Sequence, residues 1–146
     1  MRMKRSGRTS IVIVIVVALI AAIVILFLMA GESPSGVAGR FLIALAKGDS
    51  KTLAELSYMD GLSQPEIEQK WKDTKEVTKY WAFNYSIRDT RELDPTTATV
   101  ALGWYKNATS PNTYEEKFEL PMIKKDGKWK IDVRGISREM YPALPR

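Results

Sequence analysis

The chain has no cysteine and no histidine among its 146 residues. These absences exclude disulfide bonds, thiol nucleophiles and thiolate or imidazole metal ligands, and they remove the side chain that most often serves as a general base. A domain of this size folds without disulfide bonds, so the missing cysteine leaves open which side of a membrane the chain occupies. We expect neither a metal ion nor a cofactor.

A basic domain surface is also lacking. The formal net charge is +5, but Arg2, Lys4, Arg5 and Arg8 supply four of these charges, and the remaining residues carry 18 Lys and Arg against 17 Asp and Glu. Within that remainder, lysine and glutamate are interspersed rather than gathered in a stripe, as in residues 66–76. Nucleic acid is therefore not an expected partner.

The most conspicuous feature that is present is the apolar run of residues 11–30, IVIVIVVALIAAIVILFLMA, which has no charged or polar side chain, no glycine and no proline. As a helix, twenty residues cover about 30 Å, which is the thickness of the bilayer hydrocarbon core. A buried strand is the alternative reading, but strands of this length are rare and lipid favours a helix. The run predicts a single transmembrane helix.

The basic residues are unequally placed around this run. Four precede it, whereas Glu32 follows it and the next basic residue is Arg40. The positive-inside rule then predicts a cytoplasmic N-terminus and an extracytoplasmic C-terminal domain at the cell membrane. A cleaved signal peptide is the alternative, but its apolar region typically spans about 7–15 residues, so the length favours an uncleaved signal anchor.

Beyond the run, the apolar periodicity changes once. Three helices are expected first: one from Val37 that ends at Gly48, a short one through Leu53 and Leu56, and one that begins with the capping-box spacing of Ser63 and Glu66. Alternating patterns then predict strands near residues 81–87, 97–106, 114–120 and 129–133, with an Asp-Gly hairpin turn at 126–127. This order predicts an α+β fold in which helices cover one face of a curved antiparallel sheet of about four strands.

We accordingly divide the chain into a basic cytoplasmic tail (1–10), a transmembrane helix (11–30), a linker (31–36), one domain (37–134) and a C-terminal tail (135–146). The linker is short enough to keep the domain close to the membrane surface. Within the tail, Met140, Tyr141 and Leu144 are expected to pack on the sheet edge.

Three segments resemble those of a known family. The run FLIALAKGD at 41–49, the short helix at 53–56 and the closing KDGKWKIDV at 125–133 are similar to the opening and the ending of NTF2-like (cystatin-cone) domains, including the membrane-tethered DUF4878-type group. The resemblance extends over about residues 33–133. It implies a strongly bent sheet around a long helix, with a conical cavity that different members use for different tasks.

Aromatic residues supply both the expected core and the candidates for lining such a cavity. The ligand-cavity candidates are Tyr58, Trp71, Phe83, Tyr85, Trp104 and Phe118. Enzymes similar in fold, such as ketosteroid isomerases and scytalone dehydratases, use Asp, Tyr or His groups in the cone, but no catalytic residue can be carried over to this chain. Tyr58, Tyr85, Asp60 and Asp89 are the polar groups considered for a cavity, against the alternative that they lie at element ends in solvent.

Three functions remain open at this point. The first is a non-catalytic, membrane-anchored module of the cell envelope that binds a small apolar ligand or envelope proteins, or forms a homodimer through the sheet; VirB8-like subunits of type IV secretion have this layout. The second is a small isomerase, lyase or hydrolase that uses Asp and Tyr in the cone. The third is a plain anchor or spacer.

Overall fold

The computed structural model describes residues 6–107 and 113–146, with side chains described for 11–26, 31–107 and 113–146. The chain divides into two units, Met1–Gly31 and Glu32–Arg146. The first unit contains helix α1 (Ser6–Ala30), whose described side chains are exposed. Among the described residues, no helix combines the length and the apolar character required of a membrane span. Residues 1–5 of the predicted basic tail lie outside the described residues.

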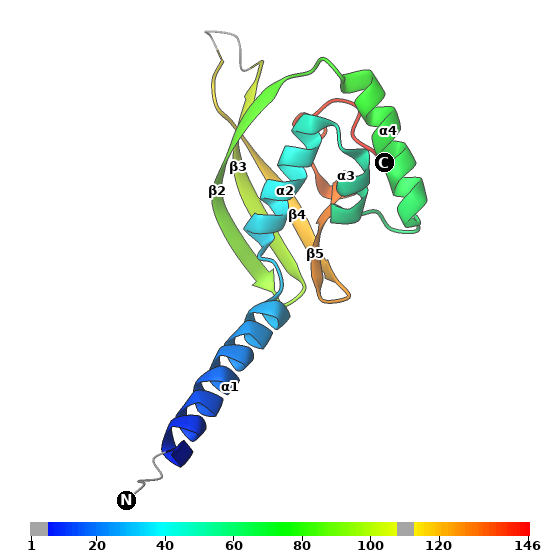
Figure 1. Ribbon diagram of the computed structural model, residues 1–146. Coiled ribbons are helices and arrows are strands. Elements are labelled where there is room, and N and C mark those ends of the chain that lie inside the picture. Colours follow the sequence, from blue (N-terminus) through cyan, green and yellow to red (C-terminus); the bar gives the residue numbers. More distant parts are fainter. Residues whose placement is uncertain (1–5, 108–112) are drawn as a thin grey trace, which may run out of the picture. The chain divides into compact units, whose positions relative to one another are not determined.

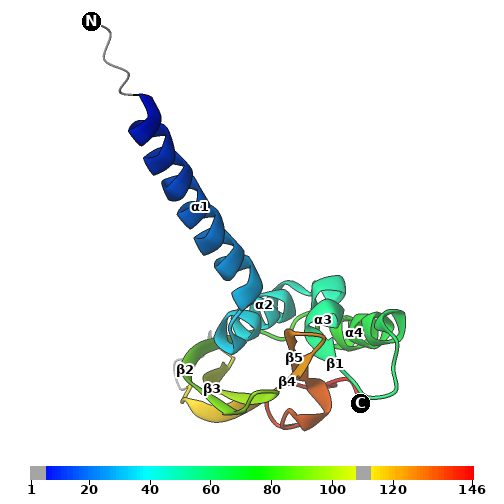
Figure 2. The ribbon, with the colours of Figure 1, turned by 90° about the horizontal axis from the view of Figure 1, so that it is seen from below.

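The second unit is an α+β domain of three helices and a five-stranded sheet. Its elements are α2 (Pro34–Lys47), α3 (Ser50–Leu56), β1 (Ser57–Tyr58), α4 (Gln64–Thr78), β2 (Phe83–Asp94), β3 (Thr97–Lys106), β4 (Glu116–Lys125), β5 (Lys128–Asp132) and the 3-10 turn η1 (Val133–Gly135). The sheet order is β1-β5-β4-β3-β2. Figures 1 and 2 show the helices on one side of this sheet, which curves around them.

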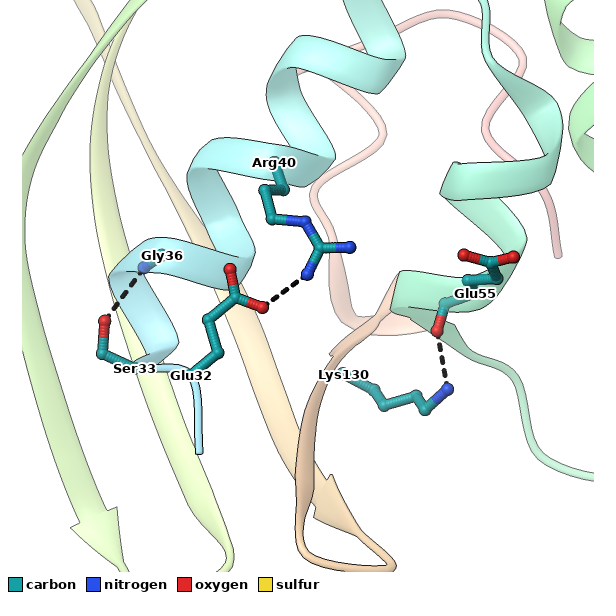
Figure 3. Close-up of polar contacts among 6 residues, drawn as sticks. All are labelled: Glu32, Ser33, Gly36, Arg40, Glu55 and Lys130. Atoms are coloured by element: carbon teal, nitrogen blue, oxygen red, sulfur yellow. Dashed lines mark hydrogen bonds and ion pairs between the residues drawn. The ribbon is translucent and has the colours of Figure 1, made fainter. Parts of the chain in front are cut away.

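The helix boundaries follow from the residues that cap them. Ser33 begins α2, because its side chain accepts a hydrogen bond from the Gly36 N–H at 3.2 Å (Figure 3). Gly48 ends the helix with φ +72°, a left-handed conformation that glycine adopts without strain. The predicted capping box of α4 is confirmed, since the Ser63 N–H donates to Glu66 at 2.7 Å.

The core lies between the helices and the inner face of the sheet. On β3, every second residue of the predicted alternating strand is buried, namely Ala98, Val100, Leu102 and Trp104. Aromatic rings also join the helices to each other: Phe41 of α2 and Trp71 of α4 pack edge to face, with ring centroids 5.6 Å apart. The period-2 pattern of β3 therefore identified the buried face correctly.

The expectation of about four antiparallel strands is wrong in number and in one orientation. The fifth strand, β1, has two residues and runs parallel to β5, with Ser57 beside Ile131. A strand of two residues is too short to show an alternating pattern, and its partner strand β5 lies more than seventy positions away in the sequence. The local sequence pattern therefore could not reveal this strand. β2 is also longer than expected, because an irregularity between Ile87 and Asp89 interrupts the alternation that marked its first half.

The C-terminal segment after η1 belongs to the same packed unit. Met140, Tyr141 and Leu144 are buried, but the segment is held by hydrogen bonds to α4 rather than at the sheet edge where it was expected. It is fastened mainly to α4, where the Thr74 hydroxyl donates to the Ala143 carbonyl at 2.6 Å. The last residues of the chain thus contribute a large ring, Tyr141, to the interior.

Candidate functional site

Four of the six ligand-cavity candidates lie together on the inner face of the sheet. Phe83 and Tyr85 come from β2, Trp104 from β3 and Phe118 from β4. Tyr85 stands directly opposite Trp104 in the strand register, and the rings of Phe83 and Trp104 are stacked at 4.4 Å. Trp104 is fully buried, whereas the other three are half-buried and keep part of each ring exposed.

Trp81 and Tyr141 join three of these four rings, and we call the resulting five rings the aromatic cluster: Trp81, Phe83, Tyr85, Trp104 and Tyr141. Phe118 lies beside the cluster, opposite Leu102 of β3. Tyr141 meets Trp81 edge to face at 4.7 Å, an arrangement favoured by the ring quadrupoles. The sequence indicated that Tyr141 packs on the domain but not that it reaches this cluster. Its position depends on how the C-terminal segment folds back onto α4.

The other two candidates lie elsewhere. Trp71 is fully buried on α4, where its Nε1 donates to the Ser57 hydroxyl at 2.9 Å. Tyr58 lies on the edge strand β1, donates to Asp60 at 3.1 Å and has the Lys125 ammonium over its ring at 4.7 Å. Within the described part of the chain, neither ring contacts the aromatic cluster.

Charged groups border the aromatic cluster on two sides. The Lys106 ammonium pairs with Glu116 at 3.2 Å and lies over the Phe118 ring at 5.5 Å. At Tyr141, the Lys75 ammonium of α4 donates to the ring hydroxyl at 2.7 Å and to the Leu45 carbonyl at 2.9 Å. The result is a platform of half-buried rings with an ammonium and a carboxylate at its rim, which suits a flat apolar molecule that carries a polar group.

The indole N–H of Trp104 adds an unpaired donor at this site. The atom is buried and has no hydrogen-bond partner among the described residues. A buried donor without a hydrogen-bond partner lowers the stability of the folded state by roughly 1–3 kcal/mol, so the unpaired indole N–H destabilises the domain at this site.

The outer face of the sheet carries a different arrangement, made of ion pairs that cross β3. Arg88 of β2 donates from two nitrogens to the Glu115 carboxylate at 2.9 and 2.8 Å, and the Tyr105 hydroxyl donates to the same carboxylate at 3.1 Å. The side chain of Glu115 lies over Gly103, because a Cβ there would approach its Oε1 within 2.1 Å. The Arg88 hydrogen bond lowers the pKa of Glu115 and raises that of Arg88.

A second pair, Arg91 with Glu119 at 2.9 Å, also joins β2 to β4. Beside these pairs lies a pocket of about 750 Å³, bordered by Arg88, Ala101, Lys117 and Glu119 among others. Leu102 of β3 and the ligand-cavity candidate Phe118 also border this pocket, together with the charged residues of the neighbouring strands. The partners of Lys117 and Glu119 across the sheet depend on the strand register, which alternation within one strand does not reveal.

Acidic side chains with shifted pKa values are all shifted downward. Hydrogen bonds from Thr97 and Thr96 lower the pKa of Asp94 to about 2, and those from Thr52 lower the pKa of Asp49. Such carboxylates stay ionised and accept hydrogen bonds, unlike a general acid, whose pKa is raised. Asp60 and Asp89 are exposed. Among the described residues, no cluster of three acidic side chains could hold a metal ion.

Comparison with known proteins adds information on the fold. No protein-family model and no curated protein sequence matches the chain. The chain resembles a solved structure described as a calcium/calmodulin-dependent protein kinase type II association domain from Thiobacillus denitrificans, with 5% identity, 69% of this chain and 90% of that chain covered, and a TM-score of 0.53.

Two other matches carry the family name. An NTF2-like protein of Shewanella oneidensis has 17% identity, covers 65% of this chain and 88% of its own, and has a TM-score of 0.47. An NTF2-like transpeptidase of Campylobacter jejuni has 16% identity, covers 68% and 97%, and has a TM-score of 0.49. Structures named NTF2-like or cystatin-like are thus among those that the chain resembles. At these identities the likeness concerns the fold alone, and the DUF4878-type assignment stays a prediction.

Proposed function

We propose that the chain is a single-pass membrane protein whose extracytoplasmic NTF2-like domain binds a small apolar ligand on the aromatic cluster. The observation that carries this proposal is the set of half-buried rings, Phe83, Tyr85 and nearby Phe118, which face the helices but remain partly open to solvent. Rings that serve only as core would be expected to be covered completely, as Trp71 is.

The anchoring part of the proposal is supported by the sequence. The apolar run of residues 11–30 is long enough to cross a bilayer, and the four basic residues before it orient the N-terminus to the cytoplasm. The exposed side chains of α1, such as Ile11 and Leu26, are the kind that lipid would cover. A reporter enzyme fused after Arg146 tests the orientation: activity restricted to the cytoplasm would refute it.

The chemistry around the rings favours binding over catalysis. An isomerase or lyase of this fold would need a carboxylate with a raised pKa near a Tyr hydroxyl. The Asp and Tyr pair that the structure brings together, Tyr58 and Asp60, lies on the edge strand β1. Of the charged groups at the aromatic cluster, Lys106 and Glu116 are paired with each other, and Lys75 donates to the Tyr141 hydroxyl.

The test of ligand binding uses the full chain in lipid nanodiscs and the flat aromatic anion 1-anilinonaphthalene-8-sulfonate as probe. Removing one ring contact with Tyr85→Ala should weaken binding about fivefold, since a ring pair contributes roughly 0.5–1.5 kcal/mol beyond its buried area. Tyr80→Ala is the control, because Tyr80 is 90% exposed. Equal probe affinity in wild type, Tyr85→Ala and Phe83→Leu would overturn the proposal.

Protein assembly through the outer sheet face is the second candidate, favoured by the alternating charges around its pocket. Arg88, Arg91 and Lys117 lie near Glu115 and Glu119, so two copies related by a twofold axis can place opposite charges against each other. In a homodimer, the outer sheet faces of two copies contact each other. In a VirB8-like scaffold, this face contacts other envelope proteins instead. Sedimentation of the wild type as a monomer at high concentration would exclude the homodimer.

A further inference from the structure

The β4–β5 hairpin concentrates positive charge in one short segment. Residues 124–130 carry four lysines and one aspartate, whereas the domain from residue 31 onward has a formal net charge of only +1. The rest of the domain is therefore net negative. The Asp126-Gly127 turn, with φ values of 51° and 75°, projects the two strands as a tight hairpin.

These lysines are not neutralised within the domain. Lys125 and Lys128 stand directly opposite each other in the hairpin register, which is unfavourable for like charges. Lys124 lies over the Trp129 ring at 5.3 Å, and the Lys130 ammonium donates to the backbone carbonyl of Glu55 at 2.6 Å (Figure 3). Among the described residues, none of the four forms an ion pair with a carboxylate.

The hairpin lies at the end of the domain where the chain enters it. Figure 1 shows the β4–β5 turn and the first turn of α2 at the same end of the domain, and α2 contacts β5, the strand that carries Lys130. Only residues 31–33 separate α1 from α2, a length of about 10 Å when extended. An anchored domain therefore holds this end within reach of the lipid headgroups.

We propose that the hairpin lysines dock the domain onto anionic phospholipid headgroups of the membrane that anchors the chain. This inference rests on the proposed anchor and adds a surface and a ligand class to it. Each lysine near an anionic surface should change the ratio of docked to undocked domain by about fivefold, and salt should weaken the effect by screening. Docking would fix the orientation of the aromatic cluster relative to the membrane.

The absence of cysteine makes a site-specific label straightforward. The full chain carries a nitroxide at Glu55→Cys, an exposed position next to Lys130, or at Tyr80→Cys as the far control. Tyr80 precedes β2, whose first residue pairs with Lys106, so it lies roughly 30 Å along β3 from Thr97 at the hairpin end. Each protein is reconstituted in phosphatidylcholine vesicles with or without phosphatidylglycerol, and access of a water-soluble nickel chelate to the label is measured.

Phosphatidylglycerol should reduce chelate access at position 55 but not at position 80. Lys125→Glu with Lys128→Glu should restore access at position 55, whereas Lys47→Glu with Lys51→Glu, the same charge change at the other end of α2 and α3, should not. Equal access with both lipids, in a chain that floats with the vesicles after a urea wash, overturns the headgroup proposal alone. A chain that does not float overturns the membrane anchor and this inference together.

Discussion

The hydroxyl of Tyr141 links the C-terminal segment to α4, and its removal should destabilise the domain measurably. The ring is 1% exposed, accepts a hydrogen bond from the Lys75 ammonium at 2.7 Å and donates to the Thr78 hydroxyl at 2.9 Å. Tyr141→Phe keeps the ring contacts with Trp81 and Phe83 but removes both hydrogen bonds. Because a hydrogen bond to a charged group contributes about 1.5–3 kcal/mol, we expect a loss of about 2 kcal/mol.

Urea unfolding of the full chain in mild detergent, followed by tryptophan fluorescence, measures this change. Trp81 and Trp104 belong to the same cluster and should report the transition. Tyr114→Phe is the matched control, since Tyr114 is 74% exposed and its change should stay within about 0.5 kcal/mol. If the loss comes from the Lys75 contact, Tyr141→Phe should cost much less in a Lys75→Met background. Equal costs in both backgrounds, or no cost in either, would refute the reasoning.

Three further outcomes can be measured. Ser57→Ala should cost about 1–3 kcal/mol in urea unfolding because it leaves the buried Trp71 N–H unpaired, and it should cost less in a Trp71→Phe background. Asp94 should stabilise the fold above its unfolded pKa near 3.8 and lose this contribution as pH falls toward its folded pKa of about 2; Asp94→Asn should remove that part of the acid dependence. Gly103→Ala should displace Glu115 and raise its pKa toward the ordinary value, as followed by NMR titration; an unchanged pKa would contradict the close approach.

The two faces of the sheet differ in chemistry, and each suits a different kind of binding within the proposed function. The inner face presents half-buried rings, which suit an apolar ligand, while the outer face presents charged pairs around a pocket, which suit a protein partner. The two sites can be tested separately: Tyr85→Ala changes only the inner face, and Lys117 and Glu119 lie only on the outer one.

The sequence by itself determined those features that depend on near neighbours. The helix end at Gly48, the capping box at Ser63, the Asp126-Gly127 turn and the alternating strand at 97–106 were all predicted, because capping, turn conformation and alternation are set within a few residues. The apolar run of residues 11–30 and its basic flank are likewise sequence properties, and they remain the basis for the proposed anchor.

Only the tertiary structure decided which distant residues meet. Strand β1 exists because Ser57 finds Ile131, and Tyr141 enters the aromatic cluster because its segment folds back onto α4. The six cavity candidates separated into four neighbours and two distant rings, Trp71 and Tyr58, because the strand register and the helix packing assign them to different places. Such contacts arise from long-range packing, which a pattern of nearby side chains does not encode.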